Sequence, residues 1–274
     1  MLSSKRIDVR LIILPEHLER LFVKTSGNTI LITGGTSGIG LGLALRFHEA
    51  GNKVIVAGRR KELLDRITTD NPGIEAVVLD VADGASILRA SEAIAARYPE
   101  LNVLINNAGI MHWEDVRDSA CLQVAEDTIT TNLLGSIRMV YTFLPQLLKK
   151  GDAAILNVTS ALAFVPFPAT PTYNATKAAL HSFTESLRVQ LADTSVQVIE
   201  IAPPGVRTTL LGQQQDENSM PLEDFLSEAM TLLQSTPKAK EIVVERAKFL
   251  RYAEANGEYE NMLTMLSTIK APRS

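Results

Sequence analysis

The chain has only one cysteine, Cys121, so it can form no intrachain disulfide and fits a reducing compartment. With one cysteine and four scattered histidines, it shows no spacing of zinc ligands. Basic residues are not in excess either, because 27 Lys and Arg face 31 Asp and Glu, for a net charge of −4. These scarcities predict a cytoplasmic protein without a bound metal and give no electrostatic basis for binding nucleic acid.

Long apolar runs are also missing, and none reaches the length of a membrane span. Near the start, the run from Leu11 to Leu14 is too short for the core of a signal peptide, and the acids among residues 1–26 argue against a transit peptide. We therefore expect no membrane partner, and we interpret residues 1–26 as an N-terminal extension that docks an apolar stripe or frays. The whole chain has 46% hydrophobic and 21% charged residues, which is typical of a globular protein, and residues 27–274 are expected to form one domain.

From residue 27 onward, short β-rich runs alternate with helical stretches. Most of the runs are apolar without alternation, as in parallel strands buried on both faces. The expected strands are Asn28–Thr33, Lys53–Ala57, Ala76–Asp80, Val103–Asn106, Ala153–Val158 and Val196–Ile201, and the expected helices lie near 38–50, 60–69, 84–97, 122–149 and 172–192. This α/β pattern predicts a Rossmann-type three-layer sandwich with a parallel sheet in the order 3-2-1-4-5-6 and a ligand at the carboxyl ends of the strands.

After Gly212 the sequence changes character. A polar segment, residues 213–219, indicates a loop, and two further helices are expected near 221–234 and 238–256. Leu222, Phe225 and Met230 are apolar at helical spacing, which fits packing on the core. Their position after the sixth strand also fits a lid over the substrate, so we predict that residues 213–256 hold lid helices.

A glycine-rich segment, Thr33-Gly-Gly-Thr-Ser-Gly-Ile-Gly40, joins the first expected strand to the first helix. Its spacing is G-x-x-x-G-x-G, and a tight strand–helix turn would need only one of these glycines. Glycines allow the backbone to approach a ligand closely, and a helix N-terminus supports a pyrophosphate. The segment therefore predicts binding of a dinucleotide through Gly34, Thr36, Ser37, Gly38, Ile39 and Gly40.

The end of the second expected strand indicates which dinucleotide is bound. An acid there would grip the ribose 2′-hydroxyl of NAD, but Gly58 stands at this position and Arg59 and Arg60 follow. Two arginines suit a 2′-phosphate, although they could also be solvated residues at the start of a helix. The sequence predicts that NADP(H) is preferred and that NAD(H) is a possible cofactor.

Tyr173 and Lys177 lie four residues apart on an expected helix and therefore share one face. A lysine charge beside a phenol favours the phenolate and lowers its pKa towards the working range of a proton donor and acceptor. A hydroxyl from a separate segment, Ser160, could then hold a substrate oxygen against the phenol. Taken singly, Ser160 could instead cap a turn, and Tyr173 could be a surface residue.

Together these residues resemble the short-chain dehydrogenase/reductase family over residues 27 to about 212. The motifs come in the family's order: the glycine segment, Asp80-Val81, Asn106-Asn-Ala-Gly109, Asn132, Ser160, Tyr173-x-x-x-Lys177 and Pro204-Gly205. The stretches 98–109 and 202–208 are most similar to a bacterial subgroup named for the operon of D-alanine esterification of teichoic acid. That name describes gene neighbourhood more than chemistry and does not identify a substrate.

The resemblance implies a role for each matching residue. Ser160 would hydrogen-bond the substrate oxygen, Tyr173 would exchange the proton, and Lys177 would also hold the nicotinamide ribose. Asn132 would bend its helix and position a water that leads protons to Lys177. The other implied cofactor residues are Asp80 and Val81 at the adenine, Asn107, Ala108 and Gly109 along the groove, and Pro204, Gly205, Val206 and Thr208, of which Thr208 would bond the carboxamide.

Two departures from the family pattern affect these expectations. Pro203 replaces an asparagine that often precedes Pro-Gly, and the turn is expected to survive. The usual carboxy-terminal strand with its glycine-rich ending is not recognisable in Thr264–Ser274. The sequence therefore supports six strands, without a basis for the seventh.

The predicted activity is hydride transfer between NADP(H) and a carbonyl or alcohol carbon. The residues expected to face the substrate are Ala161–Pro168, His112, Trp113 and the region after Leu210. Among them, Trp113, Phe164, Val165 and Phe167 suggest an apolar pocket for a small apolar or moderately polar substrate, with His112 either a polar contact or solvated. One alternative is a non-catalytic NADP-binding or scaffold protein on the same fold. Another is an epimerase or dehydratase, whose usual G-x-x-G pattern and larger substrate domain are absent here.

Apolar stripes on the helices near 122–149 and 172–192 bear on the oligomeric state. They comprise Leu133, Ile137, Val140 and Leu144 on the first helix, and Leu180, Phe183 and Leu187 on the second. In relatives such helices form a two-fold interface, so a homodimer is expected by analogy. The stripes could instead only cover the sheet.

Overall fold

The computed structural model describes residues 24–269, so nearly all of the predicted N-terminal extension lies outside the described range. Seven parallel strands form one sheet in the order β3-β2-β1-β4-β5-β6-β7. Their bounds are β1 Thr29–Thr33, β2 Lys53–Gly58, β3 Glu75–Val78, β4 Val103–Asn106, β5 Ala153–Val158, β6 Val196–Ile201 and β7 Glu241–Ile242. The predicted α/β class and the order 3-2-1-4-5-6 are confirmed, and a seventh strand extends the sheet.

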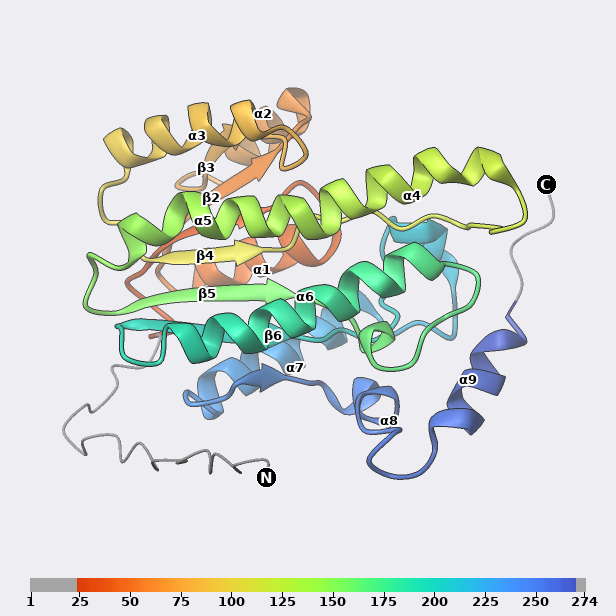
Figure 1. Cartoon of the computed structure of the whole chain (residues 1–274). Helices are drawn as coiled ribbons and strands as arrows, with labels where there is room; N and C mark the ends of the chain where they lie inside the picture. Colours follow the sequence, from red (N-terminus) through yellow and green to blue (C-terminus); the bar gives the residue numbers. More distant parts are fainter. Residues whose placement is uncertain (1–23, 270–274) are drawn as a thin grey trace, which may run out of the picture.

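Two helix layers cover the sheet, as Figure 1 shows. One core cluster joins β1, β2 and β4 to Leu43, Leu64 and Phe225 of α1 (Gly38–Glu49), α2 (Lys61–Asp70) and α7 (Leu222–Ser235). The opposite cluster contains Ile87, Phe143 and Leu187 of α3 (Gly84–Arg97), α5 (Gly135–Leu147) and α6 (Pro171–Gln190). Buried on both faces, the central strands are almost wholly apolar.

The helix expected near 122–149 is interrupted in its middle. It consists of α4 (Leu122–Ile129), a π-helical turn η2 (Thr130–Leu134) and α5, which follow one another as one long bent helix in Figure 1. Asn132 is fully buried inside the π-helical turn. Single π turns within α-helices often occur at functional sites, and this one places the Asn132 side chain where the family resemblance predicts a bend.

The seventh strand corrects the sequence-based expectation. The chain was expected to be helical near 238–256, whereas Glu241 and Ile242 pair in parallel with Glu200 and Ile201 of β6. The run from Glu241 to Val244 contains three β-branched residues, and Ile242 and Val244 are buried in the core, so burial against the sheet outweighs helix formation here. Helix α8 (Lys248–Arg251) begins only after this strand.

Part of the region expected to form a lid, helix α7, packs on the core. The apolar face of α7, with Phe225, Leu226 and Met230, is buried in the core. A Cβ added at Gly42 of α1 would lie 2.2 Å from Leu226, so the two helices are in close contact. The remaining elements are α9 (Tyr259–Ser267) and the short helices η1 (Ser119–Cys121), η3 (Ala161–Ala163), η4 (Leu210–Gln215) and η5 (Glu245–Ala247).

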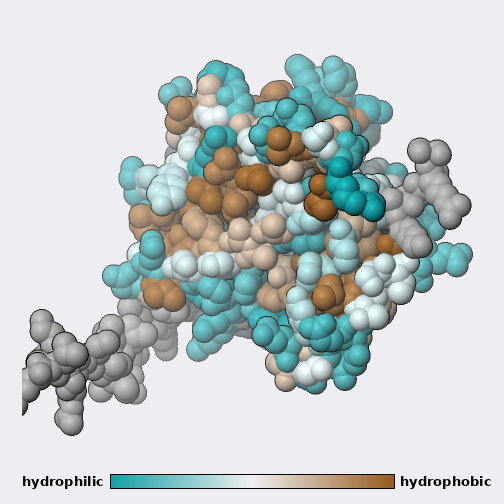
Figure 2. All heavy atoms as spheres, turned by 45° about the vertical axis from the view of Figure 1, so that its right-hand side comes forward, coloured by the Kyte–Doolittle hydropathy of each residue, from teal (hydrophilic) through white to brown (hydrophobic). Residues whose placement is uncertain are grey.

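The surface is mixed in character. Figure 2 shows hydrophilic side chains around apolar patches on the end of the molecule that carries α4 and α9. Within residues 24–269, every helix is too short or too polar to cross a membrane.

Candidate active site

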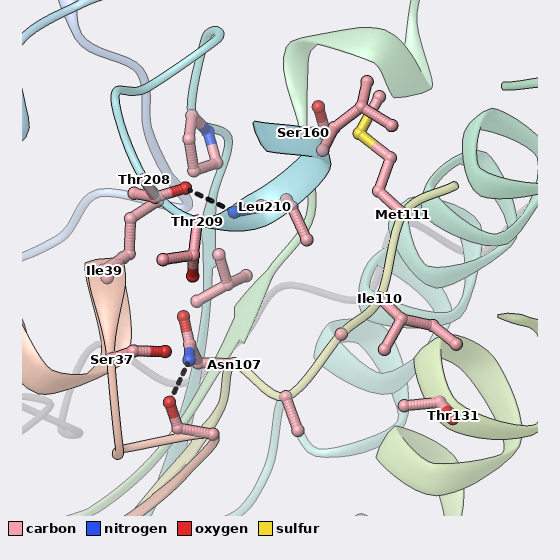
Figure 3. A pocket seen from close by; sticks show the side chains of 18 of the residues that line it. Ser37, Ile39, Asn107, Ile110, Met111, Thr131, Ser160, Thr208, Thr209 and Leu210 are labelled. Carbon is pink, nitrogen blue, oxygen red and sulfur yellow. Dashed lines mark hydrogen bonds between the residues drawn. The ribbon is translucent and has the colours of Figure 1, made fainter. Parts of the chain in front are cut away.

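A cleft of about 410 Å³ opens at the carboxyl ends of the central strands. Its lining includes all the residues predicted to bind the cofactor: Gly34, Thr36, Ser37, Gly38, Ile39, Gly40, Arg59, Arg60, Asp80, Val81, Asn107, Ala108, Gly109, Tyr173, Lys177, Pro204, Gly205, Val206 and Thr208. Ser160 also lines the cleft, whereas Asn132 lies behind it. Figure 3 shows Ser37 and Ile39 facing the segment Thr208–Leu210 across the cleft, with Ser160 and Met111 farther along it.

The glycine segment is shaped by close approach of the backbone. Gly34 and Gly38 have φ of +66° and +52°, values that favour glycine. A Cβ at Gly40 would lie 2.3 Å from the Asn107 amide nitrogen and 2.4 Å from the carbonyl oxygen of Gly34. The turn therefore requires several glycines, and the alternative of a tight strand–helix turn that needs only one glycine is wrong.

The start of α1 is open to the cleft. Its N-cap residue, Ser37, makes no capping hydrogen bond through its side chain, so the first N–H groups of the helix remain available. A free helix N-terminus beside a glycine-rich turn binds phosphate groups well. The chain's residues therefore fit a dinucleotide pyrophosphate at this position.

Thr33 and Asn107 connect the glycine segment to β4, a contact that the sequence did not reveal. The Thr33 hydroxyl accepts hydrogen bonds from the backbone N–H groups of Asn107 and Ala108, at 3.0 and 3.1 Å. In return, the Asn107 amide donates to the carbonyl oxygen of Thr33 at 3.1 Å. These bonds hold the two walls of the cleft at a fixed separation.

At the far end of the cleft, Gly58 ends β2 and no acid follows it. Arg60 donates to the Thr36 hydroxyl at 3.2 Å, whereas Arg59 is exposed and has no hydrogen bond or ion pair with the residues that the structure describes. A Cβ at Gly58 would meet the Thr36 methyl group at 2.7 Å, so this position has little room for a side chain. Two guanidinium groups thus border the place where an acid would otherwise contact the ribose.

Tyr173 and Ser160 meet at the inner end of the cleft, from α6 and from the loop after β5. Tyr173 is 6% exposed, which rules out a surface tyrosine. Burial raises the pKa of Tyr173 to about 12, and its contact with the Ser160 hydroxyl acts to lower it. The sequence predicted a lowered pKa, whereas in this structure desolvation of the phenol outweighs the effect of Ser160.

Ser160 also caps a turn, as the alternative interpretation held. Its hydroxyl oxygen accepts a hydrogen bond from the Leu162 backbone at 3.1 Å. This bond fixes the hydroxyl oxygen while leaving its proton free to be donated elsewhere. The capping role and a role towards the substrate are thus compatible.

Lys177 is buried one helical turn after Tyr173. Its ammonium donates to the Val158 carbonyl oxygen at 2.8 Å and lies 5.6 Å from the centre of the Tyr173 ring. Burial lowers the pKa of Lys177 to about 8, with the carboxylate of Glu200 acting in the opposite direction. The lysine therefore remains mostly protonated at neutral pH, close to its titration range.

Asn132 contacts the cleft wall rather than the cleft itself. Its side chain accepts from the Ile110 N–H at 2.8 Å and donates to the Ile110 carbonyl oxygen at 2.9 Å. It also donates to the Thr176 hydroxyl at 3.3 Å, next to Lys177 on α6. Asn132 thus connects the bent helix to the strand end and to the helix that carries Tyr173.

The predicted substrate pocket is only partly correct. His112 lines the cleft, but Trp113, Phe164, Val165 and Phe167 do not. The rings of Trp113 and Phe167 pack edge to face, with their centres 5.6 Å apart. Other apolar side chains that line the cleft include Met111, Leu162, Leu210 and Leu211, of which the last two belong to η4. In this structure η4 borders the cleft, and none of the lining residues belongs to α7.

Comparison with protein families agrees with this geometry. Residues 28–219 match the family described as short chain dehydrogenase. The chain belongs to this family. Its short-chain dehydrogenase relatives include the "Uncharacterized oxidoreductase DltE" of Bacillus subtilis (strain 168), which is 41% identical over 250 residues that cover 90% of this chain and 99% of the relative. That similarity agrees with the subgroup suggested by the sequence motifs.

Two other relatives carry more specific names. The "NADP-dependent 3-hydroxy acid dehydrogenase YdfG" of Salmonella typhi is 34% identical over 64% of this chain and 71% of its own length. A crystal structure of 3-ketoacyl-(acyl-carrier-protein) reductase from Brucella melitensis, complexed with NADH, has a TM-score of 0.72 at 27% identity and covers 82% of this chain and all of its own. This short-chain dehydrogenase is therefore an oxidoreductase of a family that uses NAD or NADP.

Proposed function

We propose that this protein is an NADP(H)-dependent oxidoreductase that interconverts a carbonyl and an alcohol, with Tyr173 as proton donor and acceptor. The observation that carries the proposal is the convergence of Ser160, Tyr173 and Lys177 at the inner end of a cleft whose other walls suit a dinucleotide. The bound nicotinamide would supply or accept the hydride. In accord with the single cysteine, we place this activity in the cytoplasm.

The protonation states support reduction at neutral pH. With a pKa raised to about 12, Tyr173 is a protonated phenol, ready to donate to a developing alkoxide. The Ser160 hydroxyl can hold the same substrate oxygen, because its own oxygen is fixed by Leu162. The Lys177 ammonium would stabilise the phenolate that remains after the proton has moved.

The preference for NADP(H) rests on Arg59 and Arg60. They border the cleft beyond Gly58, where an acid would be needed to select the ribose 2′-hydroxyl. Arg59 is exposed, which leaves its guanidinium available for a 2′-phosphate. NAD(H) remains a second, weaker cofactor in this proposal.

The substrate is proposed to be small and apolar or moderately polar. Met111, Leu162 and Leu210 provide an apolar lining close to Ser160, and His112 provides one polar contact.

We also propose that the protein is a homodimer. Of the stripe residues, Val140, Leu180 and Leu187 are buried against the sheet, whereas Leu133, Ile137, Leu144 and Phe183 are half-buried. The outward side of the bent helix instead exposes Leu134 and Tyr141, with exposed fractions of 40% and 71%. These side chains are suited to a two-fold contact between copies.

The function is tested with a Tyr173→Phe variant. We expect it to bind NADPH as the wild type does, and to lose at least about a thousandfold in kcat, because the proton donor is gone. NADPH oxidation is followed against a panel of aldehydes, ketones and quinones, and binding by thermal stabilisation. Wild-type NADPH binding without turnover of any panel member, or a Phe variant that keeps most of the activity, would contradict the proposal.

A further inference from the structure

A carboxylate is buried in the sheet behind the cleft. Glu200 lies in β6 within the otherwise mostly apolar run from Val196 to Ile201, and it is fully buried. Side chains along a strand alternate between its two faces. Glu200 therefore points to the face covered by α6, together with Val196 and Val198, whereas Ile199 and Ile201 point to the opposite face. A buried charge is retained only where hydrogen bonds and opposite charges compensate its lost hydration.

Two neighbours of the catalytic cleft supply those hydrogen bonds. The Thr159 hydroxyl donates to one oxygen of Glu200 at 2.6 Å, and Nδ1 of His181 contacts the other at 2.7 Å. Thr159 immediately precedes Ser160. His181 lies on α6 one turn beyond Lys177, on the same helix face as Tyr173 and Lys177. Glu200 therefore connects the loop that carries Ser160 to the helix that carries the other two groups.

A second ion pair adjoins this one. Glu241 of β7, the register partner of Glu200, accepts two hydrogen bonds from Arg251 at 2.8 Å each. Ligand atoms of His181, Glu200 and Glu241 lie within 4.8 Å of one another, an arrangement that could in principle hold a metal ion. Each of the four carboxylate oxygens already has a protein partner: Arg251 holds both oxygens of Glu241, and Thr159 and His181 hold those of Glu200.

The titration of His181 agrees with this pairing. Its hydrogen bond to Glu200 raises the pKa of His181, burial acts against it, and the charges of Glu200 and Glu241 add to the increase while Arg251 opposes it. The pair therefore gains its imidazolium charge below the resulting pKa, which lies above the ordinary value.

The titratable groups around Lys177 lie on α6, β6, β7 and α8. On α6 they are Tyr173 and His181, on β6 Glu200, and Glu241 and Arg251 lie beyond it on β7 and α8. Val158 offers a carbonyl oxygen, and Asn132 of the bent helix is neutral. Among the described residues, Glu200 is the carboxylate whose field acts on Lys177 and favours its charged form.

We propose that Glu200, held by Thr159 and His181, is a positioning residue that keeps the Lys177 ammonium charged and holds Ser160 in place for proton transfer. The part of this inference that concerns proton transfer rests on the proposed function. The part that concerns the charge of Lys177 is a property of the protein alone and can be measured without cofactor or substrate.

The first experiment therefore measures the Lys177 charge directly. Protein labelled with 13C at the lysine ε-carbons is titrated by NMR, and the Lys177 signal is assigned by its loss in Lys177→Met. In Glu200→Gln, which can keep both hydrogen bonds but lacks the charge, we expect the midpoint of Lys177 to fall by about one pH unit. Glu241→Gln removes an equal charge from the neighbouring pair and is the matched control, with an unchanged midpoint.

The second experiment measures catalysis. For NADPH-dependent reduction, the alkaline limb of the kcat/KM profile should move to lower pH in Glu200→Gln by the shift measured for Lys177. Glu200→Asp restores the charge with a shorter side chain, so its limb should return towards the wild-type position. A merely structural role would lower activity equally at every pH and leave the limb in place.

Clear results would overturn the inference. An unmoved Lys177 midpoint in folded Glu200→Gln, or an equal shift in Glu241→Gln, excludes a charge effect of Glu200. If Glu200→Gln does not fold, His181→Asn serves as the second variant, because asparagine keeps a hydrogen-bond donor for Glu200 and removes the imidazole. The titration midpoint of Lys177 should then stay or rise, and a fall would refute the inference. If no carbonyl is reduced at all, the proposed function fails while the NMR titration still decides the role of Glu200.

Discussion

Replacing Lys177 by methionine should abolish activity without lowering stability at neutral pH. The native protein keeps this side chain 4% exposed, and burial lowers its pKa from 10.5 to about 8. Since each pKa unit corresponds to about 1.4 kcal/mol, holding the ammonium in the folded state costs about 3 kcal/mol at pH 7. Methionine has a similar length and carries no charge, so the variant avoids this cost.

The loss of one hydrogen bond opposes that gain. The Lys177 ammonium donates to the Val158 carbonyl oxygen, and leaving a buried acceptor without its donor costs about 1–3 kcal/mol. The two effects together predict that Lys177→Met is between equally stable and about 2 kcal/mol more stable than the wild type at pH 7. Activity falls because the charge beside Tyr173 is lost.

The pH dependence separates these two effects. Between pH 8 and 10.5 the unfolded wild type still binds a proton at Lys177 that the folded protein has released, so wild-type stability rises with pH relative to the variant. Above that window only the lost hydrogen bond remains, and the variant should be the less stable protein. Urea unfolding of both proteins from pH 7 to 10.5 measures the difference. A variant less stable than the wild type by more than about 1 kcal/mol at pH 7, or a difference independent of pH, would refute the reasoning.

Three further predictions concern the cofactor and the assembly. Arg59→Asp should reverse or erase the preference for NADPH over NADH in thermal stabilisation, and equal stabilisation of the wild type by both cofactors would contradict the assignment. Gly40→Ala should lose cofactor binding and about 1–3 kcal/mol of stability, because the new methyl group meets Asn107 at 2.3 Å, whereas Gly84→Ala, with open space around it, should be neutral or slightly stabilising. Tyr141→Glu should convert a dimer into a monomer in analytical ultracentrifugation, and a wild type that sediments only as a monomer would exclude the dimer.

Local patterns of residues were enough to predict several features. Six apolar runs predicted the central strands, because strands buried on both faces need continuous apolar residues, and their alternation with helices predicted the strand order. The glycines from Gly34 to Gly40 predicted a tight turn with close backbone approach at the strand–helix junction, since few other residues adopt such a turn. The spacing of Tyr173 and Lys177 placed both on one helix face, as the helical repeat requires.

The tertiary structure decided what depends on residues far apart in the chain. Strand β7 forms because Glu241 and Ile242 pair with the edge strand β6, whereas the sequence of residues 238–256 by itself suggested a helix. The pKa of Tyr173 rises instead of falling because the fold buries the phenol, and no spacing reveals the degree of burial. The partners of Glu200 came from a strand end and a helix that only folding brings together, so its connection to Ser160 and Lys177 could not be predicted from the sequence.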